Sequence, residues 1–524
     1  MPAIKPLCPA CGHDEFISRG RNGMSQGSIA RVTCKNKKCG RTQSVNSLIW
    51  PDEGGHEPKL TKKRLVITAA QNATPVFTPF WESLLTYCKQ NDAQLLVIPY
   101  RYHNPTSVWG NKARRQDWWT QEVHKYLIDV RQPVNSNLTL VADIKTQPTA
   151  VNPLSGFESL TGDRSAIIAH PKLELTTIPT PQNRMPKILS TTGACTKPNY
   201  VPGKAGKKGE FHHTYGACVI EIEGNTFHMR QINACRDGSF MELAGPFKRA
   251  TQYYKDKVTQ GSVEAVVMGD SHLEFFDPTV FKTTFKQGGI IDSVKPKYLV
   301  WHDVHDFYAR LHHHIGEPFI DYVKHVYGTD NVLEMLKATA DKINVVSKAY
   351  PDVHNIFVPS NHPDALSKWL KRADWRTDPR NARFILQAQL AMLESSGWEP
   401  GRGAVMHDPF AHWMTELLHF HCAFKFLKRD EGFIIKGVDV GQHGDVGPNG
   451  IRGSRQAFGK IGIKTVIGHS HSPGIKDGVY QVGTNGTLTP EFVKGPSSWL
   501  HTDCFIYGNG KRTLINIIDG KWRA

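Results

Sequence analysis

The stretch SVEAVVMGDSH at residues 262–272 is an apolar run of strand-forming residues that ends in Asp270 and His272. Four later stretches share this design and end in Asp, Asn or His: KYLVWHD (297–303), HNIFVPSNH (354–362), GFIIKGVDVGQH (432–443) and KTVIGHSH (464–471). Amphipathic runs typical of helices lie between them, at 319–328, 331–348, 382–396 and 411–428. Strands that alternate with helices predict an α/β domain with a largely parallel sheet, whose ligands bind at the carboxyl ends of the strands. The polar strand ends are therefore expected to meet at one edge.

Other parts of the chain carry local signals. Two strand-like runs on either side of an amphipathic helix at 64–100 predict a βαβ unit, and residues 217–232 predict a hairpin that turns at Gly224-Asn225. The Gly- and Lys-rich stretch 199–213 is expected to be a solvated loop, with a phosphate-contacting loop as the alternative. After His471, short apolar runs predict antiparallel strands that finish a second sheet.

A chain of 524 residues exceeds what one hydrophobic core usually supports. Composition predicts a compact cysteine-bearing unit at 1–50, a Pro/Gly/Lys-rich linker at 51–63, an α/β domain of unassigned role at 64–250, and a domain at 251–524 with the polar-ended runs. The sequence has no run of about 18 apolar residues and no apolar secretory segment. We therefore expect a cytoplasmic protein without a membrane partner, in the host cytoplasm if a phage encodes it.

The residues at the ends of the five runs are of the types that bind divalent cations. They are Asp270, His272, Asp303, Asn361, His443, His469 and His471. Hydrolysis of a phosphodiester needs charge stabilisation on the attacking and the leaving oxygen, and two metal ions about 3.5–4 Å apart supply it. Imidazole and oxygen ligands favour manganese, with magnesium, iron or zinc as alternatives. The composition predicts a two-metal centre, with His407 as the substitute should His443 not be a ligand.

The order of these residues resembles the signature of the calcineurin-like metallophosphoesterases, over about half of the chain. The matching pieces are Gly269-Asp270-Ser271-His272, His302-Asp303-Val304-His305-Asp306, Ser360-Asn361-His362, Gly441-Gln442-His443 and Gly468-His469-Ser470-His471. His302 and Ser360 stand where the family has glycine, and Pro363 stands where it has an acidic residue. The resemblance implies an α/β fold with a two-sheet sandwich flanked by helices, preceded here by a zinc ribbon and a second α/β domain.

Carried over position by position, the resemblance implies that Asp303 bridges two ions. One ion would also bind Asp270, His272 and His471, and the other would bind Asn361, His443 and His469. A metal-bound hydroxide would attack, and His362 would touch the scissile phosphate and protonate the leaving oxygen. His305 would reach the phosphate from the second loop, and Asp364 would orient His362.

The first fifty residues contain two pairs of cysteines at the spacing of zinc knuckles. Cys8-Pro-Ala-Cys11 and Cys34-Lys-Asn-Lys-Lys-Cys39 predict a structural zinc site, because four thiolates satisfy a tetrahedral zinc ion. Free thiols or a disulfide are the alternatives. The tract resembles the zinc ribbons of transposase-like and other DNA-binding proteins, and its lysines and arginines make it basic.

Several features predict DNA as the partner. The net charge is +16, and the tract 371–383 supplies candidate contacts in Lys371, Arg372, Trp375, Arg376 and Arg380, with an exposed charged helix start as the alternative. The whole layout resembles Mre11-type nucleases and those of T5-like phages that degrade host DNA, which implies a phage-encoded, metal-dependent DNA nuclease. A phosphomonoesterase acting on protein or small molecules, and a non-catalytic DNA-binding or assembly protein, are the rival functions. Homo-oligomerisation is left open.

Overall fold

The computed structural model describes residues 8, 10, 13, 15–22, 29–44, 55–102, 118–247, 249–311, 314–419 and 421–524. The chain has a mixed α/β fold with several sheets, and it divides into two compact units. Unit 1 comprises Met1–Leu175, Lys187–Gly245 and Gln252–Thr259, and unit 2 comprises Thr176–Pro186, Pro246–Thr251 and Gln260–Ala524. Within the described part of the chain, no helix is both long and apolar enough to cross a bilayer.

Unit 1 contains the predicted βαβ unit and the predicted hairpin. Strands β4 (Arg64–Gln71) and β5 (Gln94–Tyr100) are parallel and are joined through helix α1 (Thr78–Gln90). Strands β11 (Gly216–Glu223) and β12 (Thr226–Asn233) pair antiparallel, with Glu223 opposite Thr226, and complete a sheet of order β12-β11-β4-β5. Both sequence predictions are confirmed, because βαβ units and Gly-containing two-residue turns leave strong local signals.

Unit 1 contains further strands and short helices. At its start, β1 (Phe16–Asn22), β2 (Ile29–Cys34) and β3 (Thr42–Ser44) form an antiparallel sheet. Another group has the order β10-β8-β7-β6, with bounds Lys187–Thr191, Ser165–Ile168, Leu138–Val141 and Gln132–Pro133. The short helices are η3 (Gln121–Tyr126) and α2 (Phe157–Leu160). Strands β13 (Phe240–Glu242), β14 (Ala250–Tyr254) and β15 (Lys257–Gly261) form a further small sheet.

The Gly- and Lys-rich stretch 199–213 is not the loop that its composition predicted. Residues Lys204–His212 form helix α3. A Cβ at Gly206 would collide with the backbone of Val201, so the glycine permits a close approach that fixes the start of the helix. The prediction was wrong because this local backbone contact and the Ala, Lys and Glu residues outweigh the low helix propensity of the glycines.

Unit 2 is built on two sheets. The first has the order β21-β18-β17-β16-β27-β28. Its bounds are Phe424–Phe426, His354–Phe357, Tyr298–Trp301, Val263–Val267, Thr502–Tyr507 and Arg512–Asn516. Strands β16, β17, β18 and β21 run parallel, so their carboxyl ends share one edge. Three of the five polar-ended runs therefore end at this edge as predicted, but the runs that end in His443 and His471 belong to the other sheet. Strand β27 is antiparallel to β16, and β28 is antiparallel to β27.

The second sheet of unit 2 has the order β22-β23-β24-β26-β25-β9. Its bounds are Ile434–Ile435, Val438–Asp439, Thr465–Ile467, Val479–Gln481, Gly474–Lys476 and Leu175–Ile178. The expectation that every strand after His471 finishes this sheet was wrong for β27 and β28, which extend the first sheet. Strand β27 lies beside β16 and β28 lies beside β27, and both are buried along their whole length, so both faces of this part of the sheet are covered.

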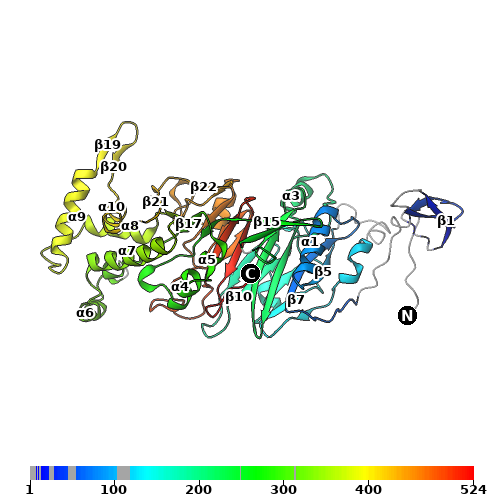
Figure 1. Cartoon of the computed structure of the whole chain (residues 1–524), viewed down its shortest axis with the longest axis horizontal. Coiled ribbons are helices and arrows are strands. Elements are labelled where there is room, and N and C mark those ends of the chain that lie inside the picture. The colour runs from blue at the N-terminus through cyan, green and yellow to red at the C-terminus, as the bar shows by residue number, and fades with distance from the viewer. Residues whose placement is uncertain are drawn as a thin grey trace. The chain divides into compact units, whose positions relative to one another are not determined.

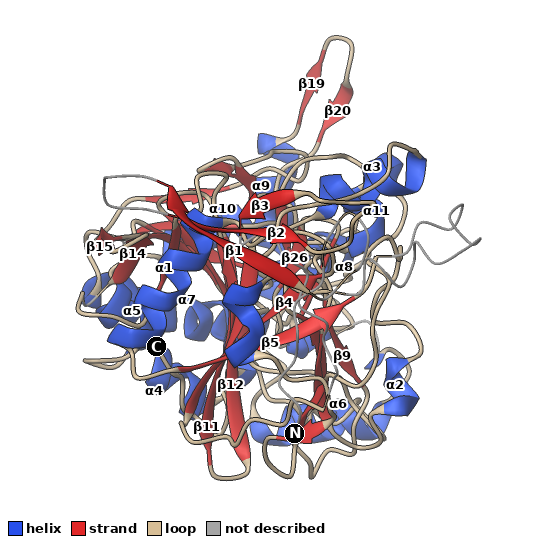
Figure 2. Ribbon diagram, turned by 90° about the vertical axis from the view of Figure 1, so that its right-hand side faces the viewer, coloured by secondary structure: helices blue, strands red, loops and turns tan. Residues whose placement is uncertain are grey.

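Helices flank the sheets of unit 2. They are α4 (Pro278–Phe285), α5 (Ile290–Val294), α6 (Pro318–Tyr327), α7 (Val332–Ala349), α8 (Asn361–Leu370), α9 (Ala382–Ser395), α10 (Pro409–Leu417) and α11 (Arg455–Gly459), with single turns η4 (Leu273–Phe275), η5 (Tyr308–Arg310) and η7 (Pro448–Gly450). Figure 1 shows α6 to α10 gathered beyond the β21 edge of the first sheet. The exposed hairpin of β19 (Gly397–Glu399) and β20 (Gly403–Val405) projects from the rest of the chain in Figure 2.

The predicted helix at 411–428 ends early. Helix α10 stops at Leu417, and strand β21 follows at Phe424–Phe426, parallel to β18. Phe426 stacks on Phe357 of β18, with ring centroids 4.6 Å apart. Pairing with β18 thus outweighs the helical pattern of residues 411–428. A short apolar run fits the periodicity of a helix as well as that of a strand, so the sequence alone does not distinguish them.

Candidate metal centre

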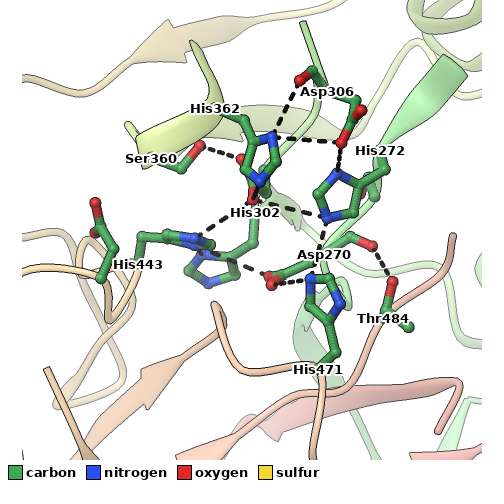
Figure 3. Close-up of polar contacts among 12 residues, drawn as sticks. Asp270, His272, His302, Asp306, Ser360, His362, His443, His471 and Thr484 are labelled. Atoms are coloured by element: carbon green, nitrogen blue, oxygen red, sulfur yellow. Dashed lines mark hydrogen bonds and ion pairs between the residues drawn. The ribbon is translucent and has the colours of Figure 1, made fainter. Parts of the chain in front are cut away.

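The carboxyl ends of the strands of unit 2 bring acidic and imidazole side chains together. Asp270 follows β16, Asp303 follows β17, and Asn361 opens α8 just after β18. His443 and His471 follow β23 and β24 of the second sheet. Figure 3 shows the side chains of Asp270, His272, His302, Asp306, Ser360, His362, His443 and His471 pointing toward one another. The site therefore lies between the two sheets, where Asp303 is only 2% exposed.

The backbone at this edge is strained. His272, Asp303, His469 and His471 all have positive φ angles, between 40° and 74°. Residues other than glycine rarely adopt this conformation, and its cost concentrates at functional sites. A Cβ on Gly468 would collide with Oδ1 of Asp270, so glycine is required where the β24 loop passes this carboxylate. The strained backbone at these positions sets the directions of the side chains.

Three of the predicted ligands converge directly. Nε2 of His471 lies 3.1 Å from Oδ2 of Asp270 and 3.1 Å from Nε2 of His272. All three residues offer a ligand atom within 4.8 Å of the others. Two ring nitrogens and a carboxylate oxygen that face one common point fit a divalent transition-metal ion, because the cation relieves the crowding of nitrogen against nitrogen.

Asp303 occupies the centre of the site. Its Oδ2 atom lies 3.7 Å from Nε2 of His272, 3.6 Å from Nε2 of His443 and 3.8 Å from Nε2 of His362. Oδ1 accepts a hydrogen bond of 2.6 Å from the hydroxyl of Ser360, which stands where the resembled family has glycine. This central place matches the bridging position expected of Asp303.

Asn361 and His469 differ in their placement. The amide oxygen of Asn361 is buried and has no hydrogen-bond partner among the described residues, which fits a group that awaits a cation. His469 is half-buried and belongs to none of the three-residue groups with ligand atoms in common reach. Its ring lies 5.4 Å from that of His443. Asn361 lies in the chain between Ser360 and His362, which both contact Asp303, whereas the imidazole of His469 lies at the margin of the site.

His302 is a functional candidate that sequence reasoning did not assign. It is fully buried, and its Nδ1 lies 3.4 Å from Nδ1 of His443. Together with Asp270 and His443 it forms a second group whose ligand atoms lie within 4.8 Å of one another. The substitution of histidine for the family's glycine immediately before Asp303 was the signal that the sequence carried.

Asp306, and not Asp364 as predicted, is the aspartate whose carboxylate lies beside His362. Oδ1 of Asp306 lies 3.0 Å from Nδ1 of His272 and 3.3 Å from Nδ1 of His362. The carboxylate of Asp364 instead accepts a hydrogen bond of 2.8 Å from Nη2 of Arg429. Helical geometry explains the difference, because Asp364 lies two residues beyond His362 on α8, and such residues do not share a face.

His305 does not reach the site, contrary to expectation. Its side chain is fully buried, with Nδ1 2.6 Å from Oε1 of Glu274 and 3.0 Å from the hydroxyl of Thr339 on α7. The other carboxylate oxygen of Glu274 accepts the backbone N–H of Asp306 at 2.9 Å. Glu274 and His305 therefore anchor the loop that carries Asp303 and Asp306, and they have no access to a substrate.

The buried histidines of the site differ in the direction in which their pKa is shifted. Burial alone would lower the pKa of His272, but the carboxylates of Asp303 and Asp306 outweigh it and raise the pKa to about 10. Burial lowers the pKa of His443 well below its usual range and also lowers that of His302. Burial would raise the pKa of Asp303, yet the neighbouring imidazoles, with His362 first, hold it low. Neutral His443 offers a lone pair to a cation, whereas His272 must release a proton to do so.

A buried carboxylic acid supports the site from behind. Oδ1 of Asp503, on β27, accepts hydrogen bonds from the backbone N–H of Gly269 at 2.8 Å and from the amide of Asn485 at 2.9 Å. Burial raises the pKa of Asp503 from 3.8 to about 6, and these two hydrogen bonds only partly oppose the shift. Asp503 therefore holds the strand end that carries Asp270.

Three of the four predicted zinc ligands lie together in unit 1. The sulfur atoms of Cys8, Cys34 and Cys39 lie within 4.8 Å of one another. Sγ of Cys8 lies 3.8 Å from Sγ of Cys39. Cys11 lies outside the described residues. The zinc site stays a prediction, and the close approach of three thiols supports it.

The predicted nucleic-acid contacts lie beyond the end of α8. Lys371, Arg372, Trp375, Arg376 and Arg380 are all exposed. Two of the five have acidic partners, since Arg376 pairs with Asp374 and Arg380 pairs with Asp330. Helix α8 advances about 15 Å over its ten residues, so this tract lies away from Asn361 and His362. It would contact DNA at a distance from the cleaved bond.

Comparison with known proteins gives one strong similarity. No model of a known protein family matches the sequence. Protein A1 of Escherichia phage T5 is 32% identical over 476 residues, which are 88% of this chain and 83% of the phage protein. Among solved structures, Chaetomium thermophilum Vps29 in complex with the cyclic peptide RT-D3 aligns with 37% of this chain and 99% of its own, at 10% identity and a TM-score of 0.19. A TM-score this low carries no argument about the fold.

Proposed function

We propose that this chain, which belongs to the same family as Protein A1 of Escherichia phage T5, is a metal-dependent phosphodiesterase of the calcineurin-like metallophosphoesterase type that cuts DNA. One observation carries the proposal: a single oxygen of Asp303 lies within 3.8 Å of ring nitrogens of His272, His362 and His443. A buried carboxylate amid three imidazoles is the arrangement that a pair of cations with a bridging ligand requires.

The residues sort into ligands of two ions. Asp270, His272 and His471 would hold one, together with Asp303. Asp303, Asn361 and His443 would hold the other, with His469 completing its shell after a movement of the half-buried ring. When bound, the cations would activate water for attack and stabilise negative charge on the phosphate. Manganese remains the expected ion, because imidazole and oxygen ligands occur together.

His362 is the residue proposed to handle the proton. Its side chain is 19% exposed and therefore accessible, and its Nε2 faces Asp303 while Nδ1 faces Asp306. Asp306 stabilises the charged imidazolium and keeps the ring oriented. Nε2 would then donate a proton to the leaving oxygen, and a histidine suits this step because its ordinary pKa lies near neutrality.

DNA is the proposed substrate because of charge and layout. The net charge of +16 favours a polyanion. Lys371 and Arg372 are exposed just beyond the end of α8, where their charges are open to a phosphate backbone. The cysteine cluster in unit 1 supports a zinc ribbon of the kind that binds nucleic acid.

The test compares substrates and variants of the full chain. Linear, circular and single-stranded DNA and bis-p-nitrophenyl phosphate should be cleaved with Mn²⁺, and EDTA should abolish cleavage. His362→Ala should lose activity on DNA by about 10²-fold or more while it retains bound metal. His325→Ala is the matched control, because His325 is exposed on α6. Faster hydrolysis of p-nitrophenyl phosphate would favour a phosphomonoesterase, and DNA binding without cleavage would favour a non-catalytic role.

A further inference from the structure

Two aromatic side chains lie beside the metal centre and are not themselves metal ligands. The ring of Trp499 contacts that of His471, with centroids 4.1 Å apart and planes at 72°. Phe492 lies next, its centroid 6.3 Å from that of Trp499, and it is 55% exposed. The two rings thus lead outward from a proposed metal ligand toward solvent.

The loop that carries these rings is firmly attached to unit 2. The hydroxyls of Ser498 and Ser472 lie 2.7 Å apart, so the residue before Trp499 is tied to the residue after His471. The backbone of Ser497 exchanges two hydrogen bonds of 2.9 Å with Thr180. The amide of Gln182 donates to the carbonyl of Val493 at 3.1 Å, beside Phe492. An aromatic side chain on an anchored loop loses little conformational entropy when it binds a ligand.

The charge around the loop is compatible with a polyanion. Glu491 is its acidic residue nearest Phe492, and its carboxylate accepts a hydrogen bond from the hydroxyl of Tyr308 at 3.1 Å and pairs with His314 at 3.1 Å. Lys494 is exposed two residues beyond Phe492. A single exposed phenylalanine is ordinary on a protein surface. Phe492 differs because its ring lies next to that of Trp499, which contacts the proposed metal ligand His471.

We infer that Phe492 and Trp499 form a stacking platform for nucleobases of the strand whose phosphate lies at the metal centre. This inference rests on the proposed function and narrows it, because inside a duplex both faces of each base are already stacked on neighbouring bases, whereas single strands and duplex ends leave a face free. Stacking depends on the π-face that every base has, so the platform is indifferent to sequence. The substrate class is therefore single-stranded DNA or the frayed end of a duplex.

The experiment uses Phe492→Ala in the full chain, with a short mixed-sequence DNA strand and bis-p-nitrophenyl phosphate as substrates. Loss of one stacked base should raise KM for the DNA strand by roughly five- to 150-fold. The kcat for the small diester, which reports the chemistry at the metal centre, should not change. Phe492→Trp should restore the wild-type KM. Phe319→Ala is the matched control, because Phe319 is 83% exposed on α6.

A second arm identifies the base as the partner. Removing bases next to the cleaved bond should raise the KM of the wild-type protein for the DNA strand. It should change the KM of Phe492→Ala little, because the variant already lacks the stacking surface. Unchanged DNA kinetics in Phe492→Ala, or an equal loss on the small diester, would overturn the inference. If the wild type cleaves neither substrate, the proposed function fails instead, and DNA affinity measured by fluorescence anisotropy in EDTA still decides whether Phe492 contributes to binding.

Discussion

The carboxylate of Asp306 lies 3.3 Å from Nδ1 of His362, and the backbone carbonyl of Asp306 lies 3.0 Å from the same nitrogen. The carbonyl oxygen can only accept a hydrogen bond, so Nδ1 carries a proton and Nε2 is left to face Asp303. This single relationship sets the tautomer and the direction of the ring proposed to act on the leaving group.

Asp306→Asn should lower kcat on phosphodiesters by about 10²-fold, because an amide does not stabilise the imidazolium of His362. Steady-state kinetics on bis-p-nitrophenyl phosphate measure the effect. Asp364→Asn provides the comparison, because Asp364 pairs with Arg429. A larger loss in Asp364→Asn than in Asp306→Asn would reverse the assignment.

Mn²⁺ should raise the melting temperature of the wild-type protein, because a ligand that binds only the folded state stabilises it by about 2.7 kcal/mol at 100 times its Kd. Asp303→Asn should lose most of this rise, since Asp303 is the central carboxylate of the site. Differential scanning fluorimetry with Mn²⁺ and with EDTA measures both. An equal rise in wild type and variant would place the cation elsewhere.

The free energy of unfolding of the metal-free protein should depend on pH through the ionisation of Asp503. Its pKa is raised from 3.8 to about 6 by burial, so between these values the folded state binds more protons than the unfolded state. This contribution to stability therefore falls as pH rises through the window, by about 3 kcal/mol in total, and stays constant above it.

Asp503→Asn should remove this decrease in stability with rising pH, because asparagine does not ionise. Its amide oxygen can still accept the hydrogen bond from the N–H of Gly269. Relative to the wild type, the variant should gain stability between about pH 4 and 6, as measured by chemical unfolding at a series of pH values. A difference that does not vary with pH would mean that Asp503 stays ionised when folded.

Cys34→Ser should lower the zinc content of the purified protein by one ion per chain, because a tetrahedral site rarely survives the loss of a thiolate. Cys34 lies with Cys8 and Cys39 in the cluster of unit 1. Cys235→Ser is the control, since Cys235 lies outside that cluster. Atomic absorption measures the metal, and unchanged zinc in Cys34→Ser would remove the prediction of a zinc ribbon.

Replacement of both Lys371 and Arg372 with alanine should reduce the salt dependence of single-stranded DNA binding, by about 0.7 in the logarithmic slope for each phosphate that is no longer neutralised. Arg376→Ala should change the slope less, because Arg376 already pairs with Asp374. Binding isotherms at several salt concentrations measure the slopes. Equal slopes in the double variant and the wild type would exclude this tract from the DNA path.

The features that the sequence predicted correctly are those with local signals. The run before Asp270 becomes β16, and the Gly224-Asn225 turn closes its hairpin, because strand patterns and turn chemistry depend on neighbours in the chain. The errors at 411–428 and at β27 have the opposite origin, because pairing with a distant strand outweighs the local preference. At α3, a local approach of Gly206 to Val201 and the Ala, Lys and Glu residues outweigh the glycines.

By itself, the sequence determined that aspartates and histidines would end the strands, but it predicted one edge where the structure divides these strand ends between two sheets. Only the tertiary structure decided which of them meet. His272 and His471 face each other across 199 residues of chain, His302 joins His443, and His305 turns into the interior toward Glu274. The physical reason is that side-chain direction follows from the packing of two sheets and from positive φ angles, which no local pattern encodes.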